Sequence, residues 1–140
     1  MISLKDTLIS LKVKSRSVAG DLGITACYAG RDENGAIFDD SVVENYLRFD
    51  LINNEIDRRN LANDDSDVML NAIWQIGVFV PKVSMNPSGE LLGLVDSVRG
   101  AFNQGLVLNA VQITRSDVSP LMDNDTHFYY AISVYFNVLV

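Results

Sequence analysis

The chain has 140 residues, 48% of them hydrophobic, and a net charge of −7. This length favours a single domain over residues 1–140, large enough to bury roughly 70% of the surface that the unfolded chain exposes. No apolar segment approaches the ~20 residues that cross a bilayer, so we expect no membrane span.

The charge is unevenly distributed, with five basic and two acidic residues in 1–31 but three basic and eleven acidic residues in 32–70. Phosphate binding needs a basic surface, so we expect no specific nucleic-acid binding. Cys27 is the only cysteine, which excludes an intrachain disulfide and fits a reducing compartment. The first ten residues include Asp6 and no continuous apolar segment, so a secretory signal is not expected.

The first predicted element is a helix. Ser3 and Asp6 have the spacing of a capping box, with Asp replacing the usual Glu or Gln. Three leucines recur on one face: Leu4, Leu8 and Leu11. We expect this helix to fray near Gly20 and Gly23, and the sequence "ENG" at Glu33–Gly35 predicts a tight turn.

Three later segments alternate between apolar and mixed positions, which predicts long strands with one buried face. They cover residues 43–51, 68–80 and 128–140, with a weaker strand at 107–114. Val43 begins the apolar face of the first segment, and Trp74 lies at the centre of the apolar face of the second, where we expect it in the core. Polar connections are expected at 53–67 and 116–127.

A second helix is predicted over residues 87–103. Asn86 suits its N-cap, Pro87 its first position, and Gly105 is placed to end it. An apolar stripe marks the face that packs on a sheet: Leu91, Val95, Val98 and Phe102. The fold class predicted is α+β, with a mainly antiparallel sheet of about four strands and two helices packed on one face.

No catalytic, cofactor-binding or metal site is predicted. In the segment "PKVSMNPSGE" at 81–90, Lys82 stands near the start and Gly89 is the only glycine, so it is not a Walker-type phosphate loop. Neither Ser84 nor Ser88 has the Gly-x-Ser-x-Gly pattern of a nucleophile elbow. His127 is the only histidine and has no second His or Cys nearby, so we expect it simply at the boundary of a loop and a strand. Cys27 is expected to be a small buried residue.

The mixed face of the predicted strands combines aromatic, amide and charged side chains. Its candidate interface residues are Tyr46, Arg48, Gln75, Tyr129 and Tyr135. Two helices can cover one sheet face but hardly two, so this face is either a subunit interface or a solvent face that is somewhat apolar.

Four segments in this order resemble the tail terminator (tail completion) proteins of long-tailed bacteriophages. They are "LKDTLISLK" at 4–12, "YLRFDLI" at 46–52, "WQIGVFVPKVSMNPSGELLGLVDSVRGAF" at 74–102 and "HFYYAISVYFNVLV" at 127–140. The resemblance covers most of the chain, but it is one of element order, without a signature motif.

The resemblance implies a structural virion protein of the tail or neck, assembled in the host cytoplasm, with no enzymatic activity and no cofactor. It implies a ring, usually of six subunits, that caps the tail tube protein and joins it to the head–tail connector protein. Arg58 and Arg59 would then be candidate ion-pair donors to a neighbour, although plain solvated charges are an equal alternative. Other functions left open are another head–tail neck or tail-tube subunit, or a small ligand-binding or enzymatic α+β domain.

Overall fold

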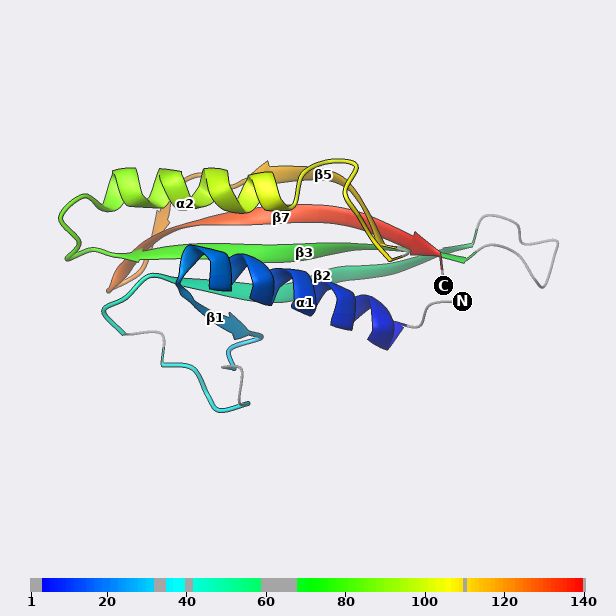
Figure 1. Cartoon of the computed structure of the whole chain (residues 1–140), viewed down its shortest axis with the longest axis horizontal. Coiled ribbons are helices and arrows are strands. Elements are labelled where there is room, and N and C mark those ends of the chain that lie inside the picture. The colour runs from blue at the N-terminus through cyan, green and yellow to red at the C-terminus, as the bar shows by residue number, and fades with distance from the viewer. Residues whose placement is uncertain (1–3, 32–34, 40–41, 59–67, 110, 140) are drawn as a thin grey trace.

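The structure, a computed structural model, describes residues 4–31, 35–39, 42–58, 68–109 and 111–139. Within these ranges the chain forms two helices and seven strands (Figure 1). Their bounds are α1 Leu4–Leu22, β1 Thr25–Tyr28, β2 Tyr46–Arg58, β3 Val68–Pro81, α2 Pro87–Ala101, β4 Val107–Leu108, β5 Val111–Val118, β6 Met122–Asp123 and β7 His127–Leu139.

All seven strands belong to one sheet, in the order β1-β2-β3-β7-β5-β4, with β6 also paired to β7. The sheet is mixed, because β1 runs parallel to β2, and it curls as a half-barrel. The expectation of a mainly antiparallel sheet of about four strands with two helices on one face is therefore wrong. The sequence pattern missed β1 and β6 because strands of four and two residues are too short to show an alternation.

Several predicted boundaries are also wrong. Residues 53–58, expected in a connection, continue β2, whereas Val43 precedes the strand and is exposed. The single strand expected at 107–114 is divided into β4 and β5 by a turn at Asn109, whose φ is +55°. The connection expected at 116–127 contains the end of β5 and all of β6. Part of the turn predicted at Glu33–Gly35 lies outside the described residues.

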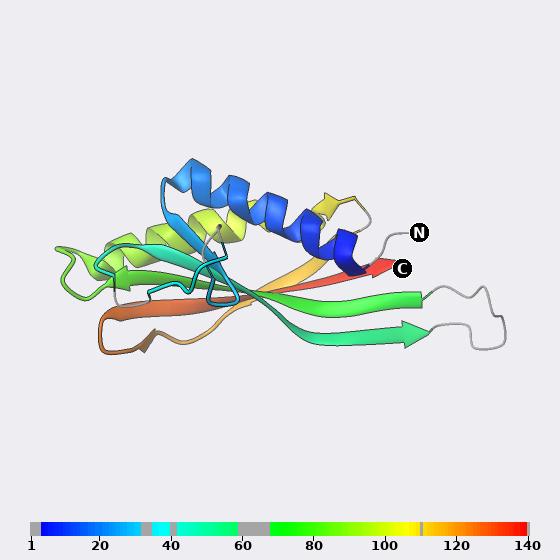
Figure 2. The ribbon, with the colours of Figure 1, turned by 90° about the horizontal axis from the view of Figure 1, so that it is seen from below.

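The main core forms where both helices meet the alternating apolar positions of the central strands (Figure 2). Residues Trp74, Ile76 and Val78 of β3 are buried there, as their spacing predicted. The predicted stripe on α2 is confirmed, since Leu91, Val95, Val98 and Phe102 are all buried. Neither α1 nor α2 is long and apolar enough to cross a membrane.

The starts and ends of the helices follow local chemistry. The Asn86 side chain accepts a hydrogen bond from the Gly89 N–H at 3.2 Å, and Pro87 opens α2, as predicted. The helix ends at Ala101, two residues earlier than expected. Helix α1 continues through Gly20, where fraying was expected, and stops before Gly23, whose φ of +67° suits glycine. Ser3, the predicted cap of α1, lies outside the described residues.

A buried hydrogen-bond chain attaches α1 to the middle of the sheet. The indole Nε1–H of Trp74 donates to the Ser15 hydroxyl at 2.9 Å, and that hydroxyl donates to the Leu11 carbonyl at 2.7 Å. Ser15 is fully buried, and its hydroxyl provides the hydrogen-bond acceptor that the indole N–H needs inside the core.

Replacing Ser15 by alanine should therefore destabilise the protein, because the Trp74 N–H loses its acceptor in a buried position. We expect the free energy of unfolding to fall by about 1–3 kcal/mol in urea denaturation followed by tryptophan fluorescence. Ser17→Ala, on the exposed side of the same helix, is the control and should change it by less than about 0.5 kcal/mol. Equal stability of the two variants would contradict this role of Ser15.

Candidate functional site: the outer face of the sheet

The face of the sheet opposite the main core, here called the outer face, is organised by the register of three strands. In that register Tyr46 of β2 lies beside Phe79 of β3, which lies beside Tyr129 of β7. Two residues along, Arg48 lies beside Gly77, which lies beside Ala131. The first row is therefore made of aromatic rings, whereas the row beside it contains two small residues, Gly77 and Ala131.

The aromatic row is a continuous stack. The ring centroids of Tyr46 and Phe79 are 4.4 Å apart at an interplanar angle of 7°, and those of Phe79 and Tyr129 are 4.6 Å apart at 22°. Phe38 adds a tilted contact to Tyr46 at 4.8 Å. Both faces of the Phe79 ring are thus covered by neighbouring rings, so Phe79 offers no free ring face on which a base could stack.

His127 supports this row from the first position of β7, at the loop–strand boundary where it was predicted. Its imidazole is buried and meets the Tyr46 ring edge-on at 5.1 Å. One ring nitrogen, Nε2, lies 3.1 Å from the Glu44 carbonyl, and the other, Nδ1, lies 2.7 Å from the Thr126 hydroxyl. Because a carbonyl can only accept, Nε2 carries the proton. Both nitrogens are occupied, so the histidine has a structural role.

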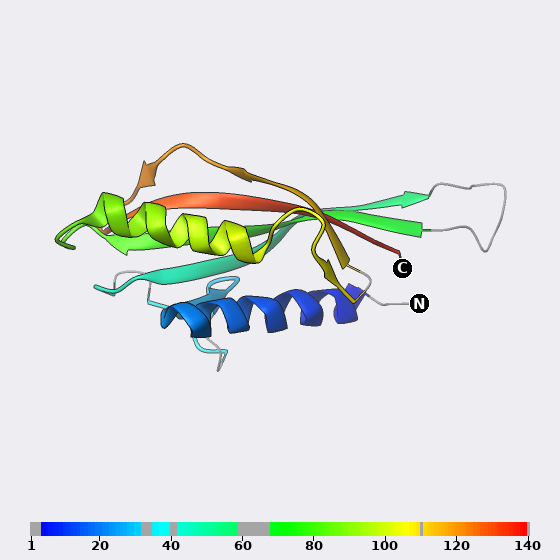
Figure 3. The same ribbon diagram turned by 45° about the horizontal axis from the view of Figure 1, so that its top comes forward.

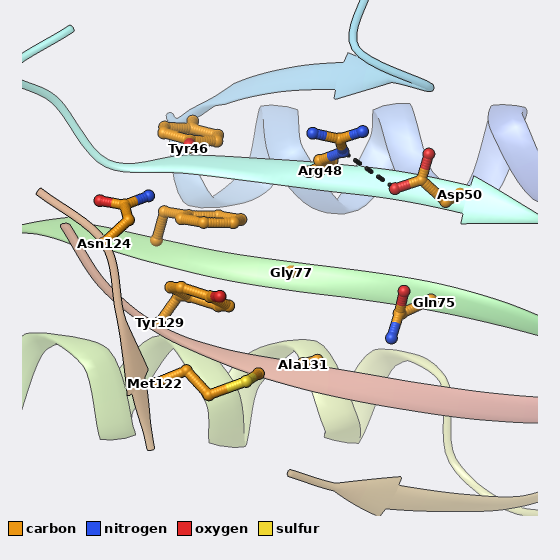
Figure 4. Close-up of a pocket in the computed structure, with 10 residues that line it drawn as sticks. Tyr46, Arg48, Asp50, Gln75, Gly77, Met122, Asn124, Tyr129 and Ala131 are labelled. Carbon is orange, nitrogen blue, oxygen red and sulfur yellow. Dashed lines mark hydrogen bonds and ion pairs between the residues drawn. The ribbon is translucent and has the colours of Figure 1, made fainter. Parts of the chain in front are cut away.

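A shallow concavity of about 430 Å³ lies beside the aromatic row (Figure 4). Gly77 and Ala131 provide its floor, because their small side chains leave space between larger neighbours. An added Cβ on Gly77 would lie 2.6 Å from Cε1 of Phe79, so the Phe79 ring leans over this glycine. The full lining is Tyr46, Arg48, Asp50, Gln75, Gly77, Phe79, Met122, Asn124, Tyr129 and Ala131.

The charged groups of the concavity neutralise each other. Arg48 Nε donates to Asp50 Oδ2 at 3.0 Å, along the same face of β2 (Figure 4). Partial burial acts to lower the pKa of Arg48, but the hydrogen bond and charge of Asp50 outweigh it and raise that pKa above its ordinary value. The pair is partly exposed, so its contribution to stability is small. No group of three metal-binding side chains occurs among the described residues.

Four of the predicted interface residues meet at this concavity: Tyr46, Arg48, Gln75 and Tyr129. Tyr135 is on the same face but farther along β7, beneath the guanidinium of Arg115 at 4.1 Å from its ring centroid. Arg58 is the last residue of β2, with its side chain outside the description, and Arg59 lies outside the described residues.

The sequence reasoning did not single out the rest of the lining. Asp50 and Gly77 could have been found by continuing the alternation that selected Arg48 and Gln75. Met122 and Asn124 gave no such signal. They belong to β6 and to the turn after it, and the alternation along the long strands does not predict where these short segments lie.

No protein-family model matches this sequence, and no curated protein matches it. Seventeen chains of solved structures are similar to it. One of them, whose name states no function, aligns with a TM-score of 0.72 over 99% of this chain and 96% of its own length, at 16% identity. A likeness at this level of identity shows a shared fold alone.

Replacing Gly77 by alanine tests the packing of the concavity floor. The new methyl group would displace the Phe79 ring from the aromatic row, so we expect the free energy of unfolding to fall by about 1–3 kcal/mol in urea. Gln75→Ala, one row away on the same face, is the control and should change it by about 0.5 kcal/mol or less. A Gly77→Ala variant as stable as the parent would show that the ring is not held in place.

Proposed function

We propose that this chain is a structural virion protein without enzymatic activity, which closes into a ring of six subunits. The ring would cap the tail tube of a long-tailed bacteriophage and join it to the head connector. The family resemblance supplies the virion role and the number six. The observation that supports ring assembly is that the sheet has two different open edges, one on β2 and one on β5.

The first open edge belongs to β2. Strand β1 pairs with β2 only as far as Phe49, while β2 continues to Arg58 with no further described strand on that side. The Phe49 carbonyl faces this edge, because it accepts a hydrogen bond from the Ala29 N–H. Backbone groups alternate in direction along a strand, so the N–H and carbonyl of Leu51 face the same edge, beyond the last described partner.

The second open edge belongs to β5. Strand β4 pairs only with Val111 and Gln112, and the last contacts on this side are made by Ile113. From Ser116 to Val118 no described strand pairs with β5 on the side away from β7. Natural proteins rarely leave such edges unprotected, because they pair readily with another strand.

The two edges favour a head-to-tail contact between copies. Strands β2, β3, β7 and β5 alternate in direction, so β5 of one copy can join β2 of the next and continue the antiparallel order (Figure 3). A contact between two unlike surfaces forms a closed ring when the rotation from one copy to the next brings the last copy back onto the first. The net charge of −7 supports the role further, since DNA would pass through an acidic ring without sticking.

Two other functions remain candidates. Another neck or tail-tube subunit would share the long strands and the ring symmetry. A small ligand-binding or enzymatic domain is supported by the outer-face concavity, whose volume of about 430 Å³ falls within the usual range of small-molecule sites. Against this last function, Arg48 and Asp50 satisfy each other instead of converging on the empty space.

Leu51→Pro tests the edge contact, because it removes an N–H that faces the open edge while leaving the hydrogen bonds between β2 and β3 intact. In negative-stain electron microscopy at high protein concentration, with and without magnesium, the parent and Leu51→Val should form closed rings. Leu51→Pro should form none, although its circular dichroism spectrum is unchanged. Rings formed equally by Leu51→Pro would exclude the β2 edge from the contact, and a parent chain that stays monomeric even with purified tail tubes would contradict the proposed function.

A further inference from the structure

The open edge of β2 borders a small hollow, called here the edge pocket. Its volume is about 220 Å³ and most of its lining is apolar. Leu51, 37% exposed, stands beside it on β2. The pocket lies on the core side of the sheet, where β1 stops covering β2. Six of its lining residues come from α1, the end of β1, β2 and β3: Leu8, Lys12, Tyr28, Ala29, Leu51 and Trp74.

The geometry of strand pairing decides which residue of an added strand would enter this pocket. Residues directly opposite each other in an antiparallel pair place their side chains on the same face of the sheet. Leu51 lies opposite Trp74, whose indole is in the main core, and its backbone N–H and carbonyl face the open edge. A partner for Leu51 must therefore combine a side chain on the core side with backbone groups that face its own open edge.

Val118 of β5 has both properties. It lies opposite Ile132 and packs against the main core, so its side chain is on the core side. The N–H of the next residue, Ser119, donates to the Ala131 carbonyl of β7 at 2.8 Å. The N–H and carbonyl of Val118 therefore point the other way, to the open edge of β5. Its side chain is only partly buried, which leaves surface that a neighbouring copy can cover.

Ser116 has the same backbone direction as Val118, but it fits Leu51 less well. A register with Ser116 opposite Leu51 would place Asp117 of one copy directly opposite Asp50 of the next. Like charges in that position destabilise a strand pair. This register is therefore disfavoured.

The register with Val118 opposite Leu51 also matches the lengths of the strands. Strand β5 ends at Val118, and Leu51 is the first edge-facing residue of β2 beyond Phe49, whose carbonyl is already bonded to the Ala29 N–H at 2.9 Å. The added strand thus stops where the end of β1 occupies the edge. Pro120, which would come opposite Phe49, has no N–H and needs no acceptor there.

We propose that Val118 of each copy pairs with Leu51 of the next and inserts its side chain into that copy's edge pocket. This inference rests on the edge contact of the proposed function and adds the register and the side chain that give the contact its specificity. It holds for any number of copies, because it concerns only how β5 of one copy meets β2 of another.

Disulfide crosslinking tests this register. Opposite residues of a hydrogen-bonded antiparallel pair have Cα atoms about 5.5 Å apart, within the span of a disulfide. A full chain carrying Leu51→Cys and Val118→Cys, concentrated and then oxidised, should therefore give covalent multimers on a non-reducing gel. The crosslink can only join two copies, because within one copy β3 and β7 lie between β2 and β5.

The matched control combines Leu51→Cys with Ser116→Cys. These positions would be diagonal neighbours, about 7–8 Å apart and beyond the reach of a disulfide, so we expect about tenfold less crosslinked product. Each single cysteine variant should stay uncrosslinked, since the natural Cys27 is buried. Dimers of Leu51→Cys alone would reveal a symmetric contact between two β2 edges and would overturn the inference.

Val118→Asp tests the side chain separately. It places a charge in an apolar pocket, so association measured by sedimentation velocity should weaken by about tenfold or more. Val83→Asp, at a valine that is 76% exposed in the loop between β3 and α2, should associate like the parent.

The inference is overturned if the Leu51→Cys, Val118→Cys chain gives no multimers, if the Ser116→Cys control crosslinks equally, or if Val118→Asp associates as the parent does. Failure of the proposed function gives a different result. Crosslinked open chains, or rings of another number, would support this contact and contradict a ring of six. Closed rings of six without the crosslink would support the proposed function and contradict this register.

Discussion

The register of β3 between β2 and β7 is the constraint on which the rest of the structure depends. Pairing runs along nearly all of β3 on both sides and places Trp74, Ile76 and Val78 together on the core side. The same register places Phe79 between Tyr46 and Tyr129 on the outer face. A slip of one residue would exchange these two faces, moving the indole out of the core and breaking the aromatic row.

The two faces of this sheet are stabilised by different interactions. On the core side, apolar burial is supplemented by the hydrogen bond from Trp74 to Ser15, which fixes the position of α1. On the outer face, rings pack against rings, and His127 holds the end of the row through the Glu44 carbonyl. The concavity exists because Gly77 and Ala131 lie next to this row, where larger side chains would have filled the space.

Short elements leave both borders of the sheet incomplete. Strands β1 and β4 each cover only part of the neighbouring long strand, which leaves open backbone on both sides of the sheet. Away from these borders, the loop between β3 and α2 exposes two apolar side chains, Val83 and Met85.

By itself, the sequence determined whatever depends on local spacing. Alternation identified the buried faces of β3 and β7, and the cap and stripe of α2 were readable from Asn86 to Phe102, because strand and helix periods act over a few residues. Only the tertiary structure decided how many strands join the sheet and that β1 runs parallel to β2. It also decided that Met122 and Asn124 complete the concavity. These features depend on contacts between residues far apart in the chain, which no local pattern encodes.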